Sequence, residues 1–177
     1  MTPATTFDFA GIKLQLTATP GILRHWLAGL PSRMLLLRTE GPDSWSPIEI
    51  VGHLIHGERT DWIARVRHIL ECRTEPFPPF DRLGMLDDEP RPIEDMLDEF
   101  ATIRNSNLQK LDAFSIGSEQ LSMTGQHPEL GEVSLGQLLS AWATHDLNHI
   151  AQIARVLAKN NLVAIGPWRA YLPIVDR

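Results

Sequence analysis

The stretch Ser140–Ile153 reads SAWATHDLNHIAQI, and the rest of the chain is best interpreted from it. It lies in a segment of helical periodicity that we expect to cover residues 135–158. His145 and His149 are one helical turn apart, so both imidazoles project from the same face and can reach a single ion. At roughly 100° per residue, both fall within the apolar stripe that contains Trp142, not on the wet face. The pair is therefore a candidate for metal binding.

The composition is that of one ordinary globular domain. The 177 residues are 43% hydrophobic and 21% charged, which excludes global disorder. The net charge is -6 and no face is rich in lysine and arginine, which argues against a nucleic-acid partner. A single cysteine excludes an internal disulfide and fits a reducing cytoplasm. Neither a signal peptide nor an apolar run long enough to span a membrane is found, so we expect a soluble cytoplasmic protein with no membrane partner.

Capping signals and apolar residues at helical spacing predict four main helices, whereas strand signals are poor. Ser46, Pro47 and Glu49 give the clearest start signal, and a second capping box at Ser134 opens the helix that carries the histidine pair. The predicted helices cover about residues 20–30, 47–71, 93–116 and 135–158, with a short helical turn at 33–37. We therefore expect an all-α four-helix bundle with one long crossover and short irregular or hairpin insertions.

The segments between and beyond these helices complete a single domain over residues 1–177. Residues 1–18 show no clear period and are interpreted as an extended lead-in. The proline-rich segment 75–89 cannot be a helix interior and is long enough to cover a site. Residues 118–133 are mixed, and residues 126–131 within them indicate a loop or a short hairpin. We expect the tail, residues 162–177, to pack back on the bundle.

A metal site needs at least a third ligand beyond His145 and His149. No glutamate stands between these two histidines in the His-Glu-x-x-His form, so the metalloprotease interpretation lacks its general base. His53 and His56 on the predicted helix 47–71 are the candidates for the third ligand. His53 lies nearly opposite the main apolar stripe of that helix, so periodicity alone does not select it.

Two motifs decide between these candidates. The first is WSPIEIVGHL at residues 45–54, followed by Glu58, and the second is Trp142 followed by HDLNHIAQI at residues 145–153. Together they resemble the two signatures of the DinB/YfiT-like superfamily, in the same order and at a similar separation. The resemblance covers most of the chain. It implies a DinB/YfiT-like four-helix bundle in which His53, His145 and His149 bind one divalent metal ion, whether nickel, zinc, iron or manganese, and it implies a homodimer.

The resemblance leaves the reaction open. Characterised relatives include enzymes that transfer bacillithiol or mycothiol, or that isomerise maleylpyruvate with mycothiol; others are described as metal-dependent hydrolases or damage-inducible proteins. A divalent ion held by three neutral imidazoles keeps its charge and lowers the pKa of a bound thiol or water. We expect a thiol-dependent S-transferase or isomerase acting on a small-molecule substrate with a low-molecular-weight thiol. The alternatives are a metal-dependent hydrolase and a non-catalytic, stress-related metal-binding protein.

Three further polar residues are candidates for catalysis. Asp146 lies in the apolar stripe of its helix, so it either orients an imidazole or pairs with an arginine. The arginines considered are Arg59, Arg65 and Arg104. Gln152 falls beside both histidines and either holds a bound water or substrate or lies on an exposed flank. Glu58 is either a base or a member of a structural ion pair.

The remaining candidates have simpler interpretations. His56 points about 60° away from His53 and is interpreted as a surface or supporting residue rather than a ligand. His127 is a loop histidine that could reach the mouth of a pocket. Cys72 has no metal-binding partner at useful spacing and is interpreted as an ordinary thiol. We expect the tryptophans to lie in the core or an interface, with Trp142 able to form a pocket wall.

Overall fold

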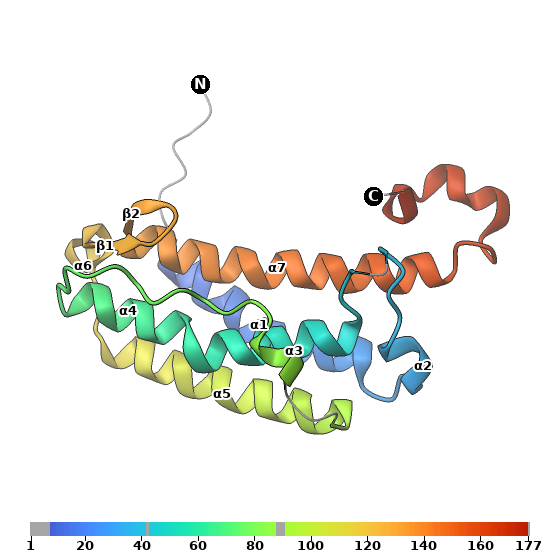
Figure 1. Ribbon diagram of the computed structural model, residues 1–177, viewed down its shortest axis with the longest axis horizontal. Helices are drawn as coiled ribbons and strands as arrows, with labels where there is room; N and C mark the ends of the chain where they lie inside the picture. Colours follow the sequence, from blue (N-terminus) through green and yellow to red (C-terminus); the bar gives the residue numbers. More distant parts are fainter. Residues whose placement is uncertain (1–7, 42, 88–90, 177) are drawn as a thin grey trace.

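A computed structural model describes residues 8–41, 43–87 and 91–176. Its long helices run alongside one another as a four-helix bundle (Figure 1), as predicted. They are α1 (Phe9–Leu27), α3 (Pro47–Thr60) continued by α4 (Trp62–Leu70), α5 (Ile93–Ala113) and α7 (Leu135–Asn160). The shorter elements are α2 (Ser32–Leu35), η1 (Gly84–Asp87), α6 (Ser118–Ser122), β1 (Thr124–His127), β2 (Gly131–Ser134), η2 (Gly166–Tyr171) and η3 (Pro173–Asp176).

Helix α1 begins earlier than predicted. Asp8 caps it, because its carboxylate accepts a hydrogen bond of 2.9 Å from the backbone N–H of Gly11. Pro20 lies inside the helix instead of opening it. The inward face repeats at helical spacing and consists of Leu16, Thr19, Leu23 and Leu27. The predicted lead-in is therefore wrong for residues 9–18, and residues 1–7 lie outside the described part of the chain.

The second predicted helix is divided at Asp61. Its backbone angles, φ −113° and ψ −70°, depart from regular helical values and separate α3 from α4. The indole of Trp62 approaches the preceding turn so closely that a Cβ on Gly57 would lie 3.3 Å from its Nε1 atom. The prediction of one unbroken helix to residue 71 is therefore wrong, because the backbone leaves the regular helix at Asp61.

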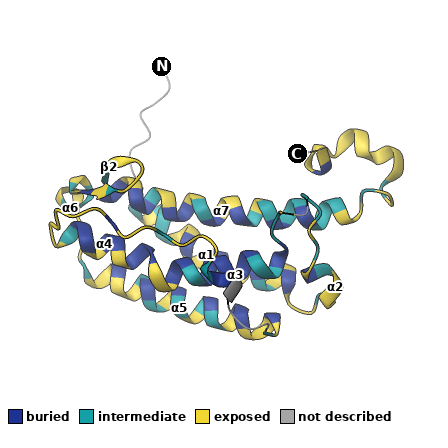
Figure 2. Ribbon diagram, viewed as in Figure 1, coloured by how far each residue is buried: buried dark blue, intermediate teal, exposed yellow. Residues whose placement is uncertain are grey.

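The bundle contains two apolar cores with a buried polar layer between them. One core surrounds Trp62 and Trp142, and the other surrounds Ile50 and Phe100. On α1, α5 and α7, the buried polar residues fall between the positions that enter the two cores, and on the helix formed by α3 and α4 Glu58 and Asp61 do so. The polar layer consists of Thr19, Glu58, Asp61, Arg104, Asn107, Asp146 and His149, with His53 on the adjoining turn of α3. Figure 2 shows buried residues along all the long helices, and the polar layer lies between the two apolar cores.

Residues 124–134 form the hairpin that the sequence allowed. Strands β1 and β2 pair antiparallel, with Gly125 opposite Val133. The backbone N–H of Phe77 donates to the carbonyl of Gln126 at 2.8 Å, and the Phe77 side chain is buried. A Cβ on Gly125 would lie only 2.8 Å from the Phe77 ring, so a larger residue would push this ring away. The contact fixes the proline-rich loop against the hairpin.

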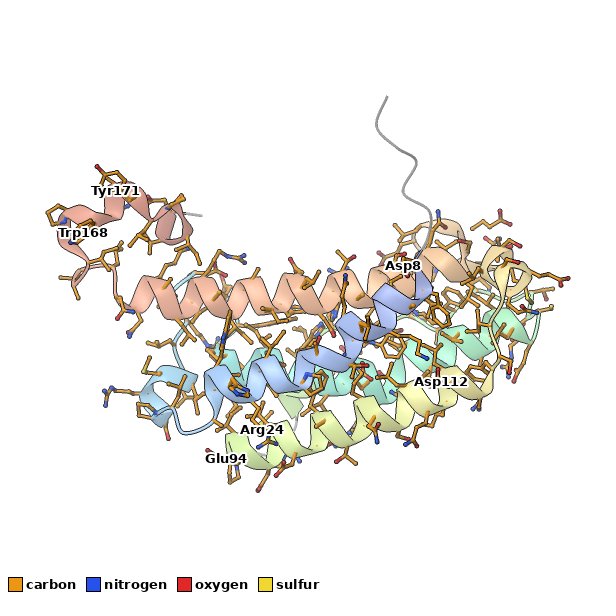
Figure 3. All side chains as sticks on the ribbon, turned by 180° about the vertical axis from the view of Figure 1, so that it is seen from behind. Asp8, Arg24, Glu94, Asp112, Trp168 and Tyr171 are labelled. Atoms are coloured by element: carbon orange, nitrogen blue, oxygen red, sulfur yellow. The ribbon has the colours of Figure 1, made fainter. Side chains whose placement is uncertain are left out.

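The C-terminal tail only partly follows the prediction. Element η3 contacts α7 and buries Val175. Trp168 and Tyr171 are instead 69% and 79% exposed, and Figure 3 shows them at the outer side of the tail. Of the two positions predicted for Trp168, the core is therefore wrong, and a place in an interface stays a prediction. Among the described helices, none combines the length and the hydropathy needed to cross a membrane.

Candidate metal centre

Three histidines from two helices converge at one point of the polar layer. The Nε2 atom of His145 lies 3.1 Å from the Nε2 atoms of both His53 and His149. One ring nitrogen of each histidine lies within 4.8 Å of those of the other two. His53 and His149 are buried, and His145 is half-buried. Thus α7 contributes two of the imidazoles and α3 contributes the third.

This arrangement fits a divalent cation. Nitrogens bonded at about 2.0–2.1 Å to one ion, at octahedral to tetrahedral angles, lie roughly 2.8–3.4 Å apart. The two distances of 3.1 Å fall in this range. Coordination through Nε2 requires the proton to be on Nδ1. The Nδ1 atom of His149 lies 2.9 Å from Oε1 of Gln152, which accepts this proton in a hydrogen bond and fixes the tautomer.

Burial keeps the three imidazoles neutral, as metal ligands must be. Removal from water is the main cause that lowers the pKa of His53 to about 4 and that of His145 to about 3, and the neighbouring imidazoles add to it. Burial also lowers the pKa of His149, although its hydrogen bond with Gln152 and the charge of Asp146 oppose the shift. At neutral pH each ring therefore offers a lone pair to a cation.

In the metal-free protein, we expect the free energy of unfolding to fall by about 2 kcal/mol from pH 7 to pH 5. Imidazoles in the unfolded chain take up protons near pH 6.5, whereas the folded pKa values of His53 and His145 are about 4 and 3. The unfolded state therefore binds more protons over this range, which favours unfolding as the pH falls. Asp61 partly opposes this, because its folded pKa of about 6 lets the native state take up a proton. Urea titrations with a chelator at both pH values measure the difference, and equal stability would contradict it.

A cavity of about 400 Å³ lies over the histidines. Its aromatic walls touch the ligand cluster: the ring centroid of His53 is 4.6 Å from that of Trp45 and 5.6 Å from that of Phe80. The Trp62 and His145 centroids are 5.3 Å apart. Among the described residues, the three histidines are joined by no fourth cysteine, histidine or carboxylate. An ion here would keep positions open toward the cavity, which is typical of catalytic rather than structural sites.

Comparison with known proteins agrees with this architecture. The family model of the DinB superfamily matches residues 15–153. This chain belongs to the DinB superfamily. Among solved structures, this DinB protein is similar to YfiT from Bacillus subtilis, with a TM-score of 0.77 and 15% identity over 91% of this chain and 94% of that chain. YfiT is described as a probable metal-dependent hydrolase with an unusual four-helix bundle topology. No curated protein matches the sequence.

In this DinB protein, two of the predicted catalytic residues belong to a buried ion-pair network. The carboxylate of Asp146 accepts hydrogen bonds from Nη1 and Nη2 of Arg104, at 2.6 and 3.0 Å, and from the hydroxyl of Thr19 at 2.6 Å. Arg104 is therefore its arginine partner. Arg104 also donates to Glu58 at 2.9 Å. Neither carboxylate belongs to the wall of the cavity over the histidines.

Glu58 is held by two further donors. The indole N–H of Trp142 donates to Oε1 at 2.8 Å, and the side-chain amide of Asn107 donates to Oε2 at 3.0 Å. These bonds, with that from Arg104, occupy both oxygens of the carboxylate. The geometry thus favours the ion-pair interpretation of Glu58. Trp142 is completely buried, and its hydrogen bond to Glu58 holds it in this network.

Sequence reasoning missed Asp61 as a residue of the site. Its buried side chain lines the cavity beside Arg65, whose Nε lies 2.7 Å from Oδ1 of Asp61. Arg82, from the proline-rich loop, also lines the cavity. No sequence signal marked Asp61, because the periodicity predicts an unbroken helix and gives no sign that the helix is interrupted at this residue. The two other predicted partners of Asp146 pair elsewhere, Arg65 with Asp61 and Arg59 with Glu99.

The remaining candidates of this DinB protein lie outside the three-histidine cluster. His127 lines the cavity, and its Nδ1 atom accepts the backbone N–H groups of Glu129 and Leu130, so it shapes the hairpin turn at the cavity mouth. The ring of His56 packs against Phe80 with centroids 5.3 Å apart. Cys72 is exposed.

Proposed function

We propose that this protein is a metal-dependent enzyme in which His53, His145 and His149 hold one divalent ion. The observation that carries the proposal is the convergence of three Nε2 atoms beneath an aromatic cavity, with no fourth ligand among the described residues. The fold shared with YfiT supports it. A set of three imidazoles suits nickel, zinc or iron better than manganese. The cavity volume of about 400 Å³ suits a small-molecule substrate.

The bound ion would lower the pKa of a thiol or water placed beside it. The residues of the chain would then place the substrate and keep the site dry. Trp45, Trp62 and Phe80 offer apolar faces to the carbon skeleton of a substrate. Arg82 is exposed at the cavity and makes no ion pair with residues 8–41, 43–87 or 91–176, so it can receive an anionic group of the substrate.

The first candidate reaction is thiol-dependent transfer. The S–H bond of the thiol breaks, the sulfur forms a bond to an electrophilic carbon, and the leaving group departs with its electron pair. The second candidate is hydrolysis, in which water replaces the thiol; the description of YfiT as a probable metal-dependent hydrolase favours it. Both need the same ligand set and the same removal of a proton from the nucleophile.

The test uses the purified chain, stripped with a chelator and reloaded separately with nickel, zinc, iron or manganese. Each form is given a panel of low-molecular-weight thiols with an electrophile, and in parallel a panel of esters and amides without thiol. Metal-dependent consumption of thiol supports the transferase. Metal-dependent release of acid without thiol supports the hydrolase. No turnover in either panel at one bound ion per chain would contradict an enzymatic role and favour a non-catalytic metal-binding protein.

Gln152→Leu is expected to weaken metal binding about 10- to 100-fold. The substitution removes the acceptor that holds Nδ1 of His149 at 2.9 Å, so the ring loses its fixed tautomer and orientation. Competition with a fluorescent chelator measures the change. Gln152→Glu is the matched control, since its carboxylate can accept the same proton and should retain binding within a fewfold of the original. Equal affinity of the leucine variant would show that Gln152 does not support the ligand.

We also propose that the protein forms a homodimer. The exposed aromatic side chains of Trp168 and Tyr171 on the tail support this, since aromatic residues are enriched in protein interfaces. Light scattering coupled to gel filtration should then give twice the chain mass of 19.9 kDa. A mass of one chain at micromolar concentration would contradict it.

A further inference from the structure

Asp61 is a carboxylate that the fold brings to the wall of the histidine cavity. It stands alone between α3 and α4, and the turn there removes it from the regular helix. Its side chain lines the cavity over the histidines and also a neighbouring cavity of about 500 Å³ that shares Pro79 and Phe80 of the proline-rich loop. Trp62, the next residue, touches the ring of His145. Asp61 therefore lines the same cavity as the three histidines.

Asp61 differs from the other buried carboxylates in how its oxygens are occupied. Both oxygens of Glu58 and of Asp146 are held by hydrogen-bond donors within the polar layer. Asp61 has only the contact of Oδ1 with Arg65, and its Oδ2 accepts no hydrogen bond from the described residues. The oxygens of Glu58 and Asp146 are thus occupied by hydrogen bonds that stabilise the fold, whereas Asp61 has an oxygen that is available to accept a proton.

The charged and titratable groups around Asp61 come from several elements. Arg65 on α4 and His56 on α3 are the nearest, and their charges favour the carboxylate form. Burial outweighs them and raises the pKa of Asp61 to about 6. The two cavities that Asp61 lines also carry other ionisable groups. These are Arg67, His68, Arg73, Asp81, Arg82, His127 and Glu129, besides the three ligand histidines.

We propose that Asp61 is the proton acceptor of this site, taking the proton from a thiol or water that is held at the three histidines. The proposal rests on the proposed function. The S–H or O–H bond of the nucleophile breaks, its electron pair stays on sulfur or oxygen, and the proton forms an O–H bond on the Asp61 carboxylate. When the leaving group departs, the proton passes to it or to solvent, and Asp61 returns to its ionised form. Arg65 positions the carboxylate toward the cavity.

The first test needs no substrate. The ionisation midpoint of Asp61 is measured by carbon NMR of aspartate-labelled protein, without metal and with zinc, and Asp61→Asn identifies the resonance. A divalent charge in the same cavity should lower the midpoint by about one pH unit or more. The aspartate at position 95, which is exposed at the start of α5, should not respond. A midpoint of Asp61 that zinc leaves unchanged would overturn the proposal, whatever the reaction proves to be.

The second test follows the proton. Loss of a general base costs about 100- to 10,000-fold in rate, so Asp61→Asn should lose turnover to this extent while still binding one zinc ion per chain. Its rate should also lose the acid limb of the pH profile, whose midpoint in the original protein matches the NMR value of the zinc form. Asp95→Asn, which removes the same charge from the surface, is the matched control.

The two tests separate this proposal from the proposed function. Turnover of Asp61→Asn within threefold of the original, with the acid limb intact, would exclude Asp61 as the acceptor while leaving the metal-dependent reaction in place. Absence of turnover in the original protein would count against the reaction alone, because the response of Asp61 to zinc still decides whether its carboxylate faces the ion. If Asp61→Asn loses its fold, assignment by backbone NMR of the original protein gives the same midpoint.

Discussion

His145→Ala should reduce bound metal from one ion per chain to less than a tenth of an ion. The Nε2 atom of His145 is the central one of the three, at 3.1 Å from each of the others. Without it, only two nitrogens remain and they come from different helices, so the chelate is lost. Metal content after dialysis against a weak chelator, measured by mass spectrometry of the elements, gives the result directly.

The matched control is His56→Ala. His56 lies on α3 close to His53, but its ring packs on Phe80 and belongs to no ligand cluster in the described part of the chain. This variant should keep one ion per chain. Equal metal content in His145→Ala and the original protein would reject the ligand assignment, and loss of metal in His56→Ala alone would move the site away from the three histidines.

Arg104→Met is expected to destabilise the metal-free fold by about 3–5 kcal/mol. The Arg104 side chain is 1% exposed and is the cation that holds both Glu58 and Asp146. Its removal leaves two carboxylates buried beside each other without a counter-charge, which costs far more than the lost contacts alone. Urea unfolding followed by circular dichroism measures the loss, and a change below 1 kcal/mol would contradict the role given to Arg104.

Two further variants give this measurement its controls. Arg24 on α1 pairs with Asp98 on α5 across an exposed surface, so Arg24→Met should cost less than about 1 kcal/mol. Combining Arg104→Met with Glu58→Gln and Asp146→Asn removes all three charges together. This triple variant should recover part of the lost stability, because no unpaired charge is left buried.

The sequence predicted the long helices where capping and periodicity agree. The start of α7 is an example: Ser134 and Gln137 exchange the two hydrogen bonds of a capping box, at 2.8 and 3.2 Å. The start of α1 was missed because a single capping aspartate, Asp8, carries no reciprocal partner three residues later. The break at Asp61 was missed because it lies in the backbone angles of one residue, which the periodicity of apolar side chains does not record.

The candidate site shows a similar division. The pair His145 and His149 could be inferred from spacing on one apolar face, whereas His53 was selected only by the resemblance of two motifs. The reason is visible in the fold: His53 adjoins the polar layer between two cores, so a single apolar stripe does not describe its helix. Asp146 could be recognised as a buried carboxylate, but its arginine lies on another helix, and only the structure identifies Arg104 among three candidates.

The polar layer also determines the axial alignment of the helices. Apolar side chains tolerate small displacements along a helix, but a shift of α5 by one turn, about 5.4 Å, would part Arg104 from its carboxylates on α3 and α7. These are the two helices that supply the metal ligands. The Arg104 guanidinium thus fixes the axial positions of α3 and α7 relative to each other. The three imidazoles are therefore aligned along the bundle axis before a metal ion binds.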